Sequence, residues 1–428
     1  MALNVLLSGH ISGRLTQGVH GHPEFSYLAE WRRAARAFPL SLSLPLAGDV
    51  NSSDKVAAVL WGLLPDNESL LQRWASQFHV SARNPVGILS HVGEDCAGAV
   101  QFVRDERLNA ILTGEDDLLE PLTDQQVGER LSRIGTGQAA SRQPTDVGQF
   151  SLAGAQAKIA LLRQEDGSWA IPSGRIPTTH ILKPPNSDFD GFVENEVFCL
   201  RLARALGASA ASAEMIVFGD QTAISVERYD RYCEEGKWKR VHQEDFCQAL
   251  GVMPHIKYQS QGGPGPADLS RVLWEHSSQP TVDVEALLQA LMFNYLIGGT
   301  DAHAKNYSML IGAAGKVRLA PLYDVSSALP YQHIQKRKIK MAMKIGNHYR
   351  WWEIGLNDWL KTAESMKVDL GKATYMLYSM ASLLPHIALR VLNELRAEGI
   401  EHEVLQRLFG EIRDSCERCL RQFELPAT

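Results

Sequence analysis

Hydrophobic positions near the start of the chain repeat with a period of two, which is the spacing of a half-buried β-strand. The positions with this spacing are Leu3, Val5, Leu7, Leu40, Leu42 and Leu44. A helical pattern follows over residues 55–64 and ends at Pro65, because proline cannot continue a helix. Residues 1–105 therefore predict a small α+β module of short strands and turns around one or two helices.

A polar stretch separates this module from the rest of the chain. Residues 106–148 contain TGEDD, TDQQ and GQAASRQPTD, a composition typical of a linker, with one helical pattern over residues 125–134. We therefore predict a linker over 106–148 and a domain boundary near its end.

The pattern changes again after this stretch, where residues 149–240 predict a β-rich part and residues 241–428 a mostly helical part. The elements that the pattern predicts are a turn at 166–168, a helix over 194–206, strands over 214–218, 221–228, 307–311 and 317–319, and a buried helix over 287–297. The order predicts a β-rich lobe followed by a helical lobe.

Composition narrows the class of protein. The chain has 428 residues, of which 45% are hydrophobic, enough to bury the cores of two or three domains and to exclude a disordered protein. Its formal net charge of −6 argues against a protein that coats nucleic acid through bulk electrostatics, and leaves room for a local basic patch.

The sequence shows no pattern of export or membrane insertion. The N-terminal MALNVLLSGHISGRL has no basic segment before its apolar residues, so it does not resemble a signal peptide. We find no segment that approaches the roughly 18 uncharged apolar residues of a membrane helix. The sequence therefore predicts a soluble, cytoplasmic protein without a membrane partner.

The six cysteines are scattered along the chain, which predicts reduced, structural thiols. Cys416 and Cys419 form a CxxC within a helical pattern, with no second pair of ligands nearby. Because a zinc site needs four ligands, we interpret this pair as two thiols on one face of a helix.

One segment in the C-terminal half carries the residue types that phosphoryl transfer needs. The reaction uses Mg²⁺ held by carboxylate and amide oxygens, and a carboxylate beside the attacking hydroxyl. GGTDAHAKN follows an apolar helical pattern that ends at Ile297, so Asp301 begins a loop that is fixed to a rigid element. Asn306 has the spacing from Asp301 that protein-kinase catalytic loops use, and Asp324 follows the next strand pair, where a metal-binding carboxylate is expected.

Taken alone, each of these residues favours a simpler interpretation, because Asp and Asn in loops more often make turns than chemistry. Their combination with a lysine earlier in the chain favours the kinase interpretation over simple turns. Lys183 lies in the apolar strand pattern THILKPP and can reach phosphates from there; the alternative is an edge-strand lysine that prevents aggregation. Glu194 and Glu196 open the next helical pattern, where one could orient Lys183 or both could simply favour a helix N-terminus.

Two further segments suit nucleotide binding. SLAGAQAK, with Gly154 as its only glycine, is a loop of small residues whose backbone amides can approach phosphates, although it is not a Walker A sequence. SVERYDR ends a strand where a linker between lobes is expected, and its backbone groups could bind an adenine. The alternative for Glu227 is a surface acid at the end of a strand.

In order and spacing, several segments of the chain resemble the HipA kinase family. The segments are SLAGAQAKIALL, THILKPP, ENEVFCLRLA, VERYDR, HQEDFCQALG, GGTDAHAKNYS, LAPLYDVSSA and MAMKIG. LSLPL and GLLPDN also resemble that family's N-terminal module, so the resemblance covers nearly the whole chain. It implies an α+β, two-lobed protein-kinase-like fold with a β-rich N-terminal lobe, an extra N-terminal subdomain and an all-helical C-terminal lobe.

The resemblance also implies a role for each matching residue. Asp301 would be the catalytic base, Asn306 and Asp324 would hold Mg²⁺, and Lys183 would contact the phosphates of ATP. The other residues expected at the ATP site are Leu152, Ala153, Gly154, Ala155, Gln156, Glu227, Tyr229 and His303. His303 and Gln243 match positions in the active-site cleft. For each of these two residues, a catalytic role and support of a loop remain alternatives.

Ser151 begins the small-residue loop. In the HipA family the serine at this position is autophosphorylated, which expels the loop and disables ATP binding. A phosphate adds roughly −1.5 to −2 charges, which opposes a second polyphosphate beside it. The resemblance therefore implies an inhibitory switch at Ser151, and the alternative is a serine that only caps the loop.

A basic stretch lies after the expected metal ligand, where a kinase has its activation segment. Its residues are Lys336, Arg337, Lys338, Lys340 and Lys344. A surface that docks a substrate or nucleic acid and an ordinary solvated loop are both compatible with this pattern. The neighbouring Trp351 and Trp352 favour core positions over a stacking platform.

The function that the resemblance implies is a serine/threonine kinase toxin that phosphorylates a translation component, with an aminoacyl-tRNA synthetase as the expected substrate. A helix-turn-helix antitoxin of the HipB type would neutralise it and bring DNA binding indirectly. The alternatives are a kinase of a small molecule or lipid on the same fold and a catalytically silent binding module. The full set of Lys183, Asp301, Asn306 and Asp324 argues against the silent module.

Overall fold

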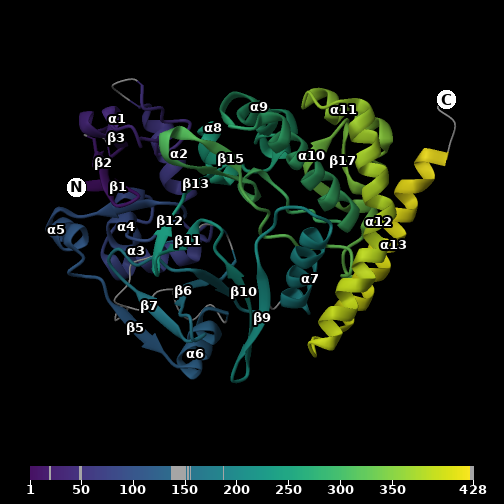
Figure 1. The fold of residues 1–428 in the computed structure, drawn as a ribbon, viewed down its shortest axis with the longest axis horizontal. Helices are drawn as coiled ribbons and strands as arrows, with labels where there is room; N and C mark the ends of the chain where they lie inside the picture. The colour runs from purple at the N-terminus through teal and green to yellow at the C-terminus, as the bar shows by residue number, and fades with distance from the viewer. Residues whose placement is uncertain are drawn as a thin grey trace. The chain divides into compact units, whose positions relative to one another are not determined.

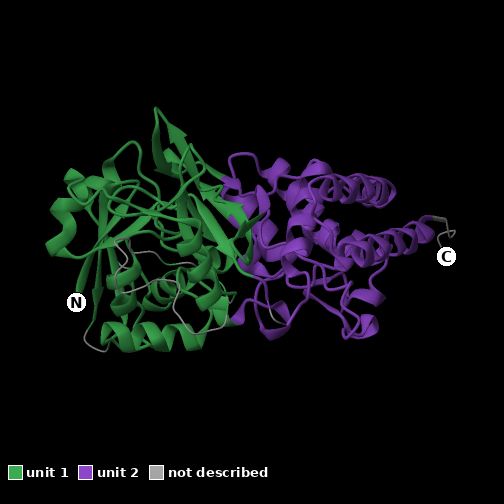
Figure 2. Cartoon of the chain, turned by 90° about the horizontal axis from the view of Figure 1, so that it is seen from below, with its two compact units in different colours: residues 1–184, 216–255, 309–317 green, residues 185–215, 256–308, 318–428 purple. Residues whose placement is uncertain are grey.

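The computed structural model describes residues 1–18, 21–47, 51–135, 151, 154, 156–186 and 188–424. The chain forms two compact units, each assembled from segments that are far apart in the sequence (Figure 1, Figure 2). Unit 1 comprises Met1–Pro184, Ile216–His255 and Met309–Val317. Unit 2 comprises Pro185–Met215, Ile256–Ser308 and Arg318–Thr428.

Unit 1 begins with a four-stranded sheet in the order β3-β2-β1-β4. Its strands are β1 (Ala2–Leu7), β2 (His10–Gln17), β3 (Pro23–Tyr27) and β4 (Val100–Val103), and the helices between them are α1 (Ala29–Arg33), α2 (Ser53–Gly62), α3 (Glu68–Phe78) and α4 (Pro85–Val92). The first predicted strand and the predicted helix are present as β1 and α2. β1 lies in the middle of its sheet, which is why almost all its side chains are buried.

The alternating leucines Leu40, Leu42 and Leu44 do not form a strand over residues 40–44, and this part of the prediction is wrong. The segment makes only an isolated bridge between Ser41 and Leu44. The hydroxyl of Tyr27 donates to the Leu44 carbonyl at 2.6 Å and accepts the Leu40 amide at 2.7 Å. Because one buried tyrosine satisfies these backbone groups, the segment needs no ladder of strand hydrogen bonds.

The segment with linker composition contains ordered structure. It forms α5 (Asp105–Thr113), β5 (Leu119–Leu122) and α6 (Asp124–Gly135). The one helix that the pattern indicated is α6, whose residues Val127, Leu131 and Ile134 are buried. Of the polar motifs, TGEDD begins at the end of α5, TDQQ lies at the start of α6, and GQAASRQPTD lies outside the described residues.

A six-stranded sheet in the order β5-β7-β6-β8-β10-β9 forms the centre of the second half of unit 1. Its other strands are β6 (Ile159–Arg163), β7 (Trp169–Pro172), β8 (His180–Lys183), β9 (Ala213–Phe218) and β10 (Gln221–Glu227). One core joins this sheet to α6, with buried residues Leu122, Val127, Leu131, Ile134, Ile159, Leu161, Trp169, Ile171, Leu182, Phe218 and Ala223. β8 is a central strand with β6 on one side and β10 on the other.

Small elements complete unit 1. They are the hairpin β11 (Arg231–Glu234) and β12 (Lys237–Arg240), the helix α8 (Phe246–Leu250), and the sheet β13-β14-β15 (His242–Asp245, Ser308–Ile311, Val317–Leu319). The strand pair predicted over 307–311 and 317–319 is present as β14 and β15.

Unit 2 is mostly helical. Its helices are α7 (Phe192–Ala205), α9 (Pro266–His276), α10 (Pro280–Ile297), α11 (Leu356–Ser365), α12 (Leu370–Ala397) and α13 (Glu403–Glu424). The C-terminal part is not all-helical, because β16 (Lys340–Ile345) and β17 (His348–Arg350) form a hairpin in addition to β13–β15. Gly346, with φ +53°, makes the turn of this hairpin, and the buried residues Met341, Ala342 and Met343 hold β16 against the helices of unit 2.

α12 is long and apolar enough to span a bilayer by length and composition, although the sequence led us to expect no such segment. Buried core helices of soluble proteins have the same properties. α12 packs against α7, α10, α11 and α13, and its residues Leu377, Leu384 and Leu395 are fully buried. The two thiols of the CxxC lie on α13; both are buried, and all six cysteines are free.

Candidate active site

The C-terminus of α10 positions the loop that carries Asp301. The helix ends at Gly298, which adopts φ +68°, and a Cβ atom there would lie 2.3 Å from Cγ of Leu329. The amide of Gly299 donates to the Asn294 carbonyl at 2.7 Å, which closes the last turn. Only glycine fits this left-handed, crowded position, so the chain leaves the buried helix at one defined angle.

Three groups hold the backbone of the loop while the Asp301 carboxylate stays accessible. The main-chain carbonyl of Asp301 accepts the His303 amide and the side-chain Nδ2 of Asn306, both at 2.8 Å. The Asn306 amide in turn donates to the His303 carbonyl at 2.9 Å. The Asp301 side chain is 65% exposed, whereas its neighbours Ala304 and Lys305 are buried.

Two aromatic side chains lie next to the Asp301 carboxylate. The hydroxyl of Tyr258 donates to Oδ1 of Asp301 at 2.5 Å, and Nε2 of His303 lies 3.8 Å from the same oxygen. The Tyr258 and His303 rings meet edge to face, with their centroids 5.0 Å apart. His303 is buried, so in the structure it lines the base of the loop and supports Tyr258.

Asp324 follows a segment that is anchored on both sides. The backbone of Leu322 pairs with Ser209 and Ala211 through hydrogen bonds of 2.9 and 2.8 Å. The hydroxyl of Tyr323 donates to the Lys305 carbonyl at 2.6 Å, which ties the segment to the loop of Asp301. Asp324 itself has φ +53°, a conformation that residues other than glycine adopt uncommonly and often at functional sites.

The residues after Asp324 return to the end of α10. Oγ of Ser327 donates to the Ile297 carbonyl at 2.5 Å, and the Ala328 amide donates to the Gly298 carbonyl at 3.0 Å. Asn195 of α7 also holds Ser327, since its side chain accepts the Ser327 amide and donates to the Ser327 carbonyl. Asp301, His303, Asn306 and Asp324 therefore belong to segments that are fastened to one helix terminus of unit 2.

The residues expected to hold Mg²⁺ carry oxygen donors, which is the ligand type of a hard cation. Nδ2 of Asn306 donates to the Asp301 carbonyl, so Oδ1 is the atom that Asn306 would offer, and Asp324 would offer carboxylate oxygens. Among the described residues there is no cluster of three His, Cys, Asp or Glu side chains suited to a metal ion. Mg²⁺ in phosphoryl-transfer sites uses one or two carboxylates together with substrate phosphates and water.

Lys183 lies in unit 1, at the end of β8. Its residue is 4% exposed and pairs with Ile224 of β10, in the middle of the six-stranded sheet. The alternative of an edge-strand lysine is therefore wrong, because β8 has a neighbour on each side. Burying an ammonium group is costly, so a lysine in a central strand points to a specific role rather than to solubility.

The segment expected beside an adenine follows β10. Glu227 is the last residue of this strand and is exposed. The hydroxyl of Tyr229 donates to the side-chain oxygen of Gln243. Gln243, which the family resemblance assigned to the active-site cleft, therefore contacts a residue that is expected beside the adenine.

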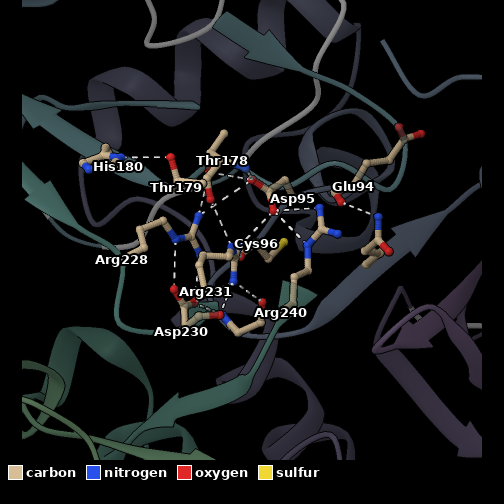
Figure 3. A network of polar contacts seen from close by, with 12 residues as sticks. Glu94, Asp95, Cys96, Thr178, Thr179, His180, Arg228, Asp230, Arg231 and Arg240 are labelled. Carbon is tan, nitrogen blue, oxygen red and sulfur yellow. Dashed lines mark hydrogen bonds and ion pairs between the residues drawn. The ribbon is translucent and has the colours of Figure 1, made fainter. Parts of the chain in front are cut away.

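A buried ionic network surrounds the backbone on both sides of Tyr229, and Figure 3 shows its side chains. Asp95 contacts Arg231 and Arg240 at 3.0 Å and Arg228 at 3.7 Å. Asp230 accepts from Arg228 at 2.9 Å and from the Gly98 amide at 2.7 Å. The charged members of this network are Asp95, Asp230, Arg228, Arg231 and Arg240, all of them within unit 1.

Neutral groups satisfy the remaining hydrogen-bonding capacity of the network. Oδ2 of Asp95 accepts the amide and hydroxyl of Thr178 at 3.0 and 2.6 Å, and the carbonyls of Cys96 and Gly98 accept from Arg231. Burial alone would raise the pKa of Asp95, but the three guanidinium groups around it more than offset burial and hold that pKa well below its usual range. Asp95 is therefore ionised throughout the physiological pH range.

Ser151 is fully buried in unit 1. Its hydroxyl donates to the Leu63 carbonyl at 2.8 Å, and its amide donates to the Asp95 carbonyl at 2.9 Å. Gly154, with φ +103°, accepts the Asp66 amide at 3.0 Å. Gln156 is partly buried, and the predicted ATP contacts Leu152, Ala153 and Ala155 lie outside the described residues.

The basic stretch is partly neutralised. Lys336 pairs with Glu411 at 2.6 Å, and the guanidinium of Arg337 lies over the ring of Trp352. Trp351 is buried as expected, but Trp352 is 46% exposed, and Arg418 packs against both rings.

Both terminal parts of the chain match family models. The HipA-like C-terminal domain matches residues 150–392, and the HipA N-terminal domain matches residues 3–103. The chain belongs to the HipA family. The putative kinase Y4mE of Sinorhizobium fredii is 37% identical over 399 residues, which is 92% of either chain. The serine/threonine-protein kinase toxin HipA of Shewanella oneidensis is 30% identical over 339 residues, 76% of this chain and 73% of that protein.

The fold agrees with this assignment. A structure of Shewanella oneidensis HipA in complex with HipB and operator DNA has a TM-score of 0.84 and 25% identity, covering 99% of this chain and 100% of that one. The chain thus has the α+β, two-lobed kinase-like fold of HipA, as the sequence predicted.

Two features of this HipA-family site were not predicted from the sequence. Tyr258 is separated from Asp301 by a glycine- and proline-rich stretch and two helices, and no spacing connects them. The ionic network joins Asp95 to an arginine-rich segment more than a hundred residues later. The charges of VERYDR and of Arg240 were visible, but a run of charges is normally solvated, and only tertiary contacts show that these are buried.

Proposed function

We propose that this protein is an ATP- and Mg²⁺-dependent serine/threonine protein kinase of the HipA toxin type. The observation that supports this most is the loop of unit 2 in which the Asp301 carboxylate is 65% exposed while hydrogen bonds from His303 and Asn306 hold its backbone. A general base must be accessible to its substrate and fixed in direction, and this loop provides both properties in a chain of a kinase family.

In this proposal each catalytic role belongs to a named residue. Asp301 accepts the proton of the substrate hydroxyl while the new O–P bond forms and the bond to the β-phosphate breaks. Asn306 and Asp324 would hold Mg²⁺, which neutralises charge on the phosphates when bound. His303 lies beside Asp301 and supports the loop.

The nucleotide would be held by residues of two kinds. Lys183 supplies a positive charge for the phosphates from a rigid central strand, and the segment of Glu227 and Tyr229 receives the adenine. Leu152, Ala153, Gly154, Ala155 and Gln156 would cover the phosphates. The predicted division into a subdomain over 1–105, a linker over 106–148, an ATP-binding part over 149–240 and a catalytic part over 241–428 belongs to this proposal.

Ser151 would be the site of inhibitory autophosphorylation. Its hydroxyl is buried against the Leu63 carbonyl, where a phosphate group with its negative charge and three oxygens has no room. Phosphorylated Ser151 must therefore leave this position, and the bonds that the serine makes to Leu63 and Asp95 would be lost.

The partners in this proposal are those of a toxin–antitoxin pair. The similarity to a HipA that is bound to HipB and operator DNA supports a helix-turn-helix antitoxin of the HipB type, with DNA reached only through that antitoxin. The substrate would be a translation component, with an aminoacyl-tRNA synthetase first among the candidates, and the site of action would be the cytoplasm.

Transfer of labelled γ-phosphate from ATP with Mg²⁺ tests the proposal. The full-length wild-type protein and Asp301→Asn are incubated with cell lysate, and intact mass is measured for each enzyme. We expect label on a lysate protein and on Ser151 with the wild type only. Ser151→Ala serves as a matched control that should label the lysate protein but not itself. Label on small molecules or lipids alone would instead identify the alternative kinase, and ATP binding without any transfer would identify a silent binding module.

A further inference from the structure

The hydrogen bond between Tyr258 and Asp301 has a consequence for the reaction. The Tyr258 hydroxyl donates to Oδ1 of Asp301 at 2.5 Å, and His303 lies 3.8 Å from that same oxygen. A carboxylate has two oxygens, and a base needs only one of them for the proton it accepts. Both neighbours are on Oδ1, so Oδ2 is the oxygen that remains for a substrate hydroxyl.

We propose that Tyr258 is a positioning residue that orients the Asp301 carboxylate for proton transfer in the kinase reaction. This inference rests on the proposed function. Asp301 has a short side chain on an exposed loop, and without a donor its carboxylate can rotate about its terminal bond, because such torsions have broad minima. The tyrosine removes this freedom before the substrate arrives, which is how preorganised groups contribute to catalysis.

Tyr258 is itself held in place from several directions. Its ring packs edge to face on the buried His303, at a centroid distance of 5.0 Å. Its carbonyl accepts the amides of Gln261 and Gly263 at 2.9 and 3.0 Å, which closes the short helix η2 (Gln259–Gln261). The side chain of Gln259 accepts the Lys344 amide at 2.6 Å, so η2 is attached to strand β16.

This arrangement distinguishes Tyr258 from a tyrosine that merely fills space. Its hydroxyl contacts the expected base, its ring contacts the residue that supports the base, and the neighbouring Gln259 side chain binds β16. A phenylalanine keeps the ring contacts and removes only the hydroxyl. The variant Tyr258→Phe therefore tests the hydrogen bond without a large change in packing.

The test compares steady-state phosphoryl transfer by the full-length wild type, Tyr258→Phe and Tyr375→Phe. Tyr375 lies on α12, is 73% exposed, and serves as the matched control. A hydrogen bond to a charged group that orients a base predicts a fall in kcat of roughly tenfold or more for Tyr258→Phe. We expect the KM for ATP and the melting temperature to stay unchanged, and Tyr375→Phe to match the wild type.

A kcat for Tyr258→Phe equal to or above that of the wild type would overturn the inference, because the hydroxyl would then contribute nothing to turnover. A rise in KM for ATP at constant kcat would overturn it as well.

A crystal structure of Tyr258→Phe tests the positioning without any activity. More than one orientation of the Asp301 carboxylate is the expected result, and a single unchanged orientation would refute the role. An inactive wild type, in contrast, would count against the proposed kinase function and leave the crystallographic result to decide on Tyr258.

Discussion

Two regions of this protein use acidic side chains in opposite ways. In unit 1, Asp95 and Asp230 are buried, and three arginines with several backbone groups satisfy their oxygens. In unit 2, Asp301 is largely exposed, and the hydrogen bonds around it hold its backbone and one of its two carboxylate oxygens.

The difference distinguishes charges that stabilise the fold from charges that are accessible to a substrate. A buried, fully bonded carboxylate has no capacity left for a substrate, and removing it leaves unpaired charges behind. An exposed carboxylate on a fixed loop contributes little to folding and can accept a proton. The ionic network therefore shapes the segment of Tyr229, whereas the α10 loop presents Asp301.

The largest effect is expected from Asp301→Asn. Loss of a general base reduces turnover by about 100- to 10,000-fold, and we expect this loss in phosphoryl-transfer assays with ATP and Mg²⁺. The free energy of unfolding should stay close to that of the wild type, because the side chain is 65% exposed. A variant that loses its fold together with its activity would contradict the assignment of Asp301 to chemistry.

Asp95→Asn, in contrast to Asp301→Asn, is expected to lower the free energy of unfolding. The substitution leaves Arg228, Arg231 and Arg240 with only Asp230 to compensate them, and breaking a buried ion pair typically costs about 3–5 kcal/mol. Denaturant unfolding measures this loss. The matched control is Asp105→Asn, in a pair with Arg14 whose acid is 61% exposed, where we expect a much smaller loss. Equal stability of the two variants would show that the network is not structural.

Lys183→Met changes a residue that is buried, as Asp95 is, and that is expected to contact ATP. The lysine is buried and has interaction partners, and removing a buried charged group leaves its partners unsatisfied. We expect a lower melting temperature and, at temperatures where the variant is folded, a loss of ATP turnover of roughly 100-fold, in line with a contact to the phosphates. A clear fall in melting temperature with full activity would assign Lys183 to structure instead.

A pH-dependent effect is expected at Glu244, which is buried and contacts the backbone of residues 40–44. Oε1 of Glu244 accepts the Leu42 amide at 2.8 Å, and burial raises the pKa of Glu244 from 4.5 to about 8. Because the folded state holds this proton more tightly, the contribution of Glu244 to stability is complete below pH 4.5 and is lost as the pH rises to about 8.

Glu244→Gln should remove this dependence, whose slope for one group is at most about 1.4 kcal/mol per pH unit. The measurement is thermal unfolding of both proteins between pH 5 and 9. We expect the two melting temperatures to agree at the acid end and that of the glutamine variant to be higher at the alkaline end. Parallel curves for the two proteins would rule out a proton on Glu244.

Much of the local structure could be predicted from short-range patterns. β1, α2, α6, β10, β14 and β15 were all indicated by periodicity and turn residues, since a strand or helix must bury one face. Where tertiary contacts replaced local ones the prediction was wrong: the side chains of Tyr27 and Glu244 bind the backbone of residues 40–44 without a strand, and a glycine turn allows a hairpin in a lobe that the family resemblance implied to be all-helical.

The sequence by itself determined the family and the loop that we propose to be catalytic, because Asp301, His303 and Asn306 lie within a few residues of one another and their spacing is a property of the chain. Only the tertiary structure decided that β8 is a central strand around Lys183, that Tyr258 reaches Asp301, and that Asp95 is enclosed by arginines. These contacts join residues that are distant along the chain. Their burial and hydrogen bonds depend on how whole elements pack, which no local spacing records.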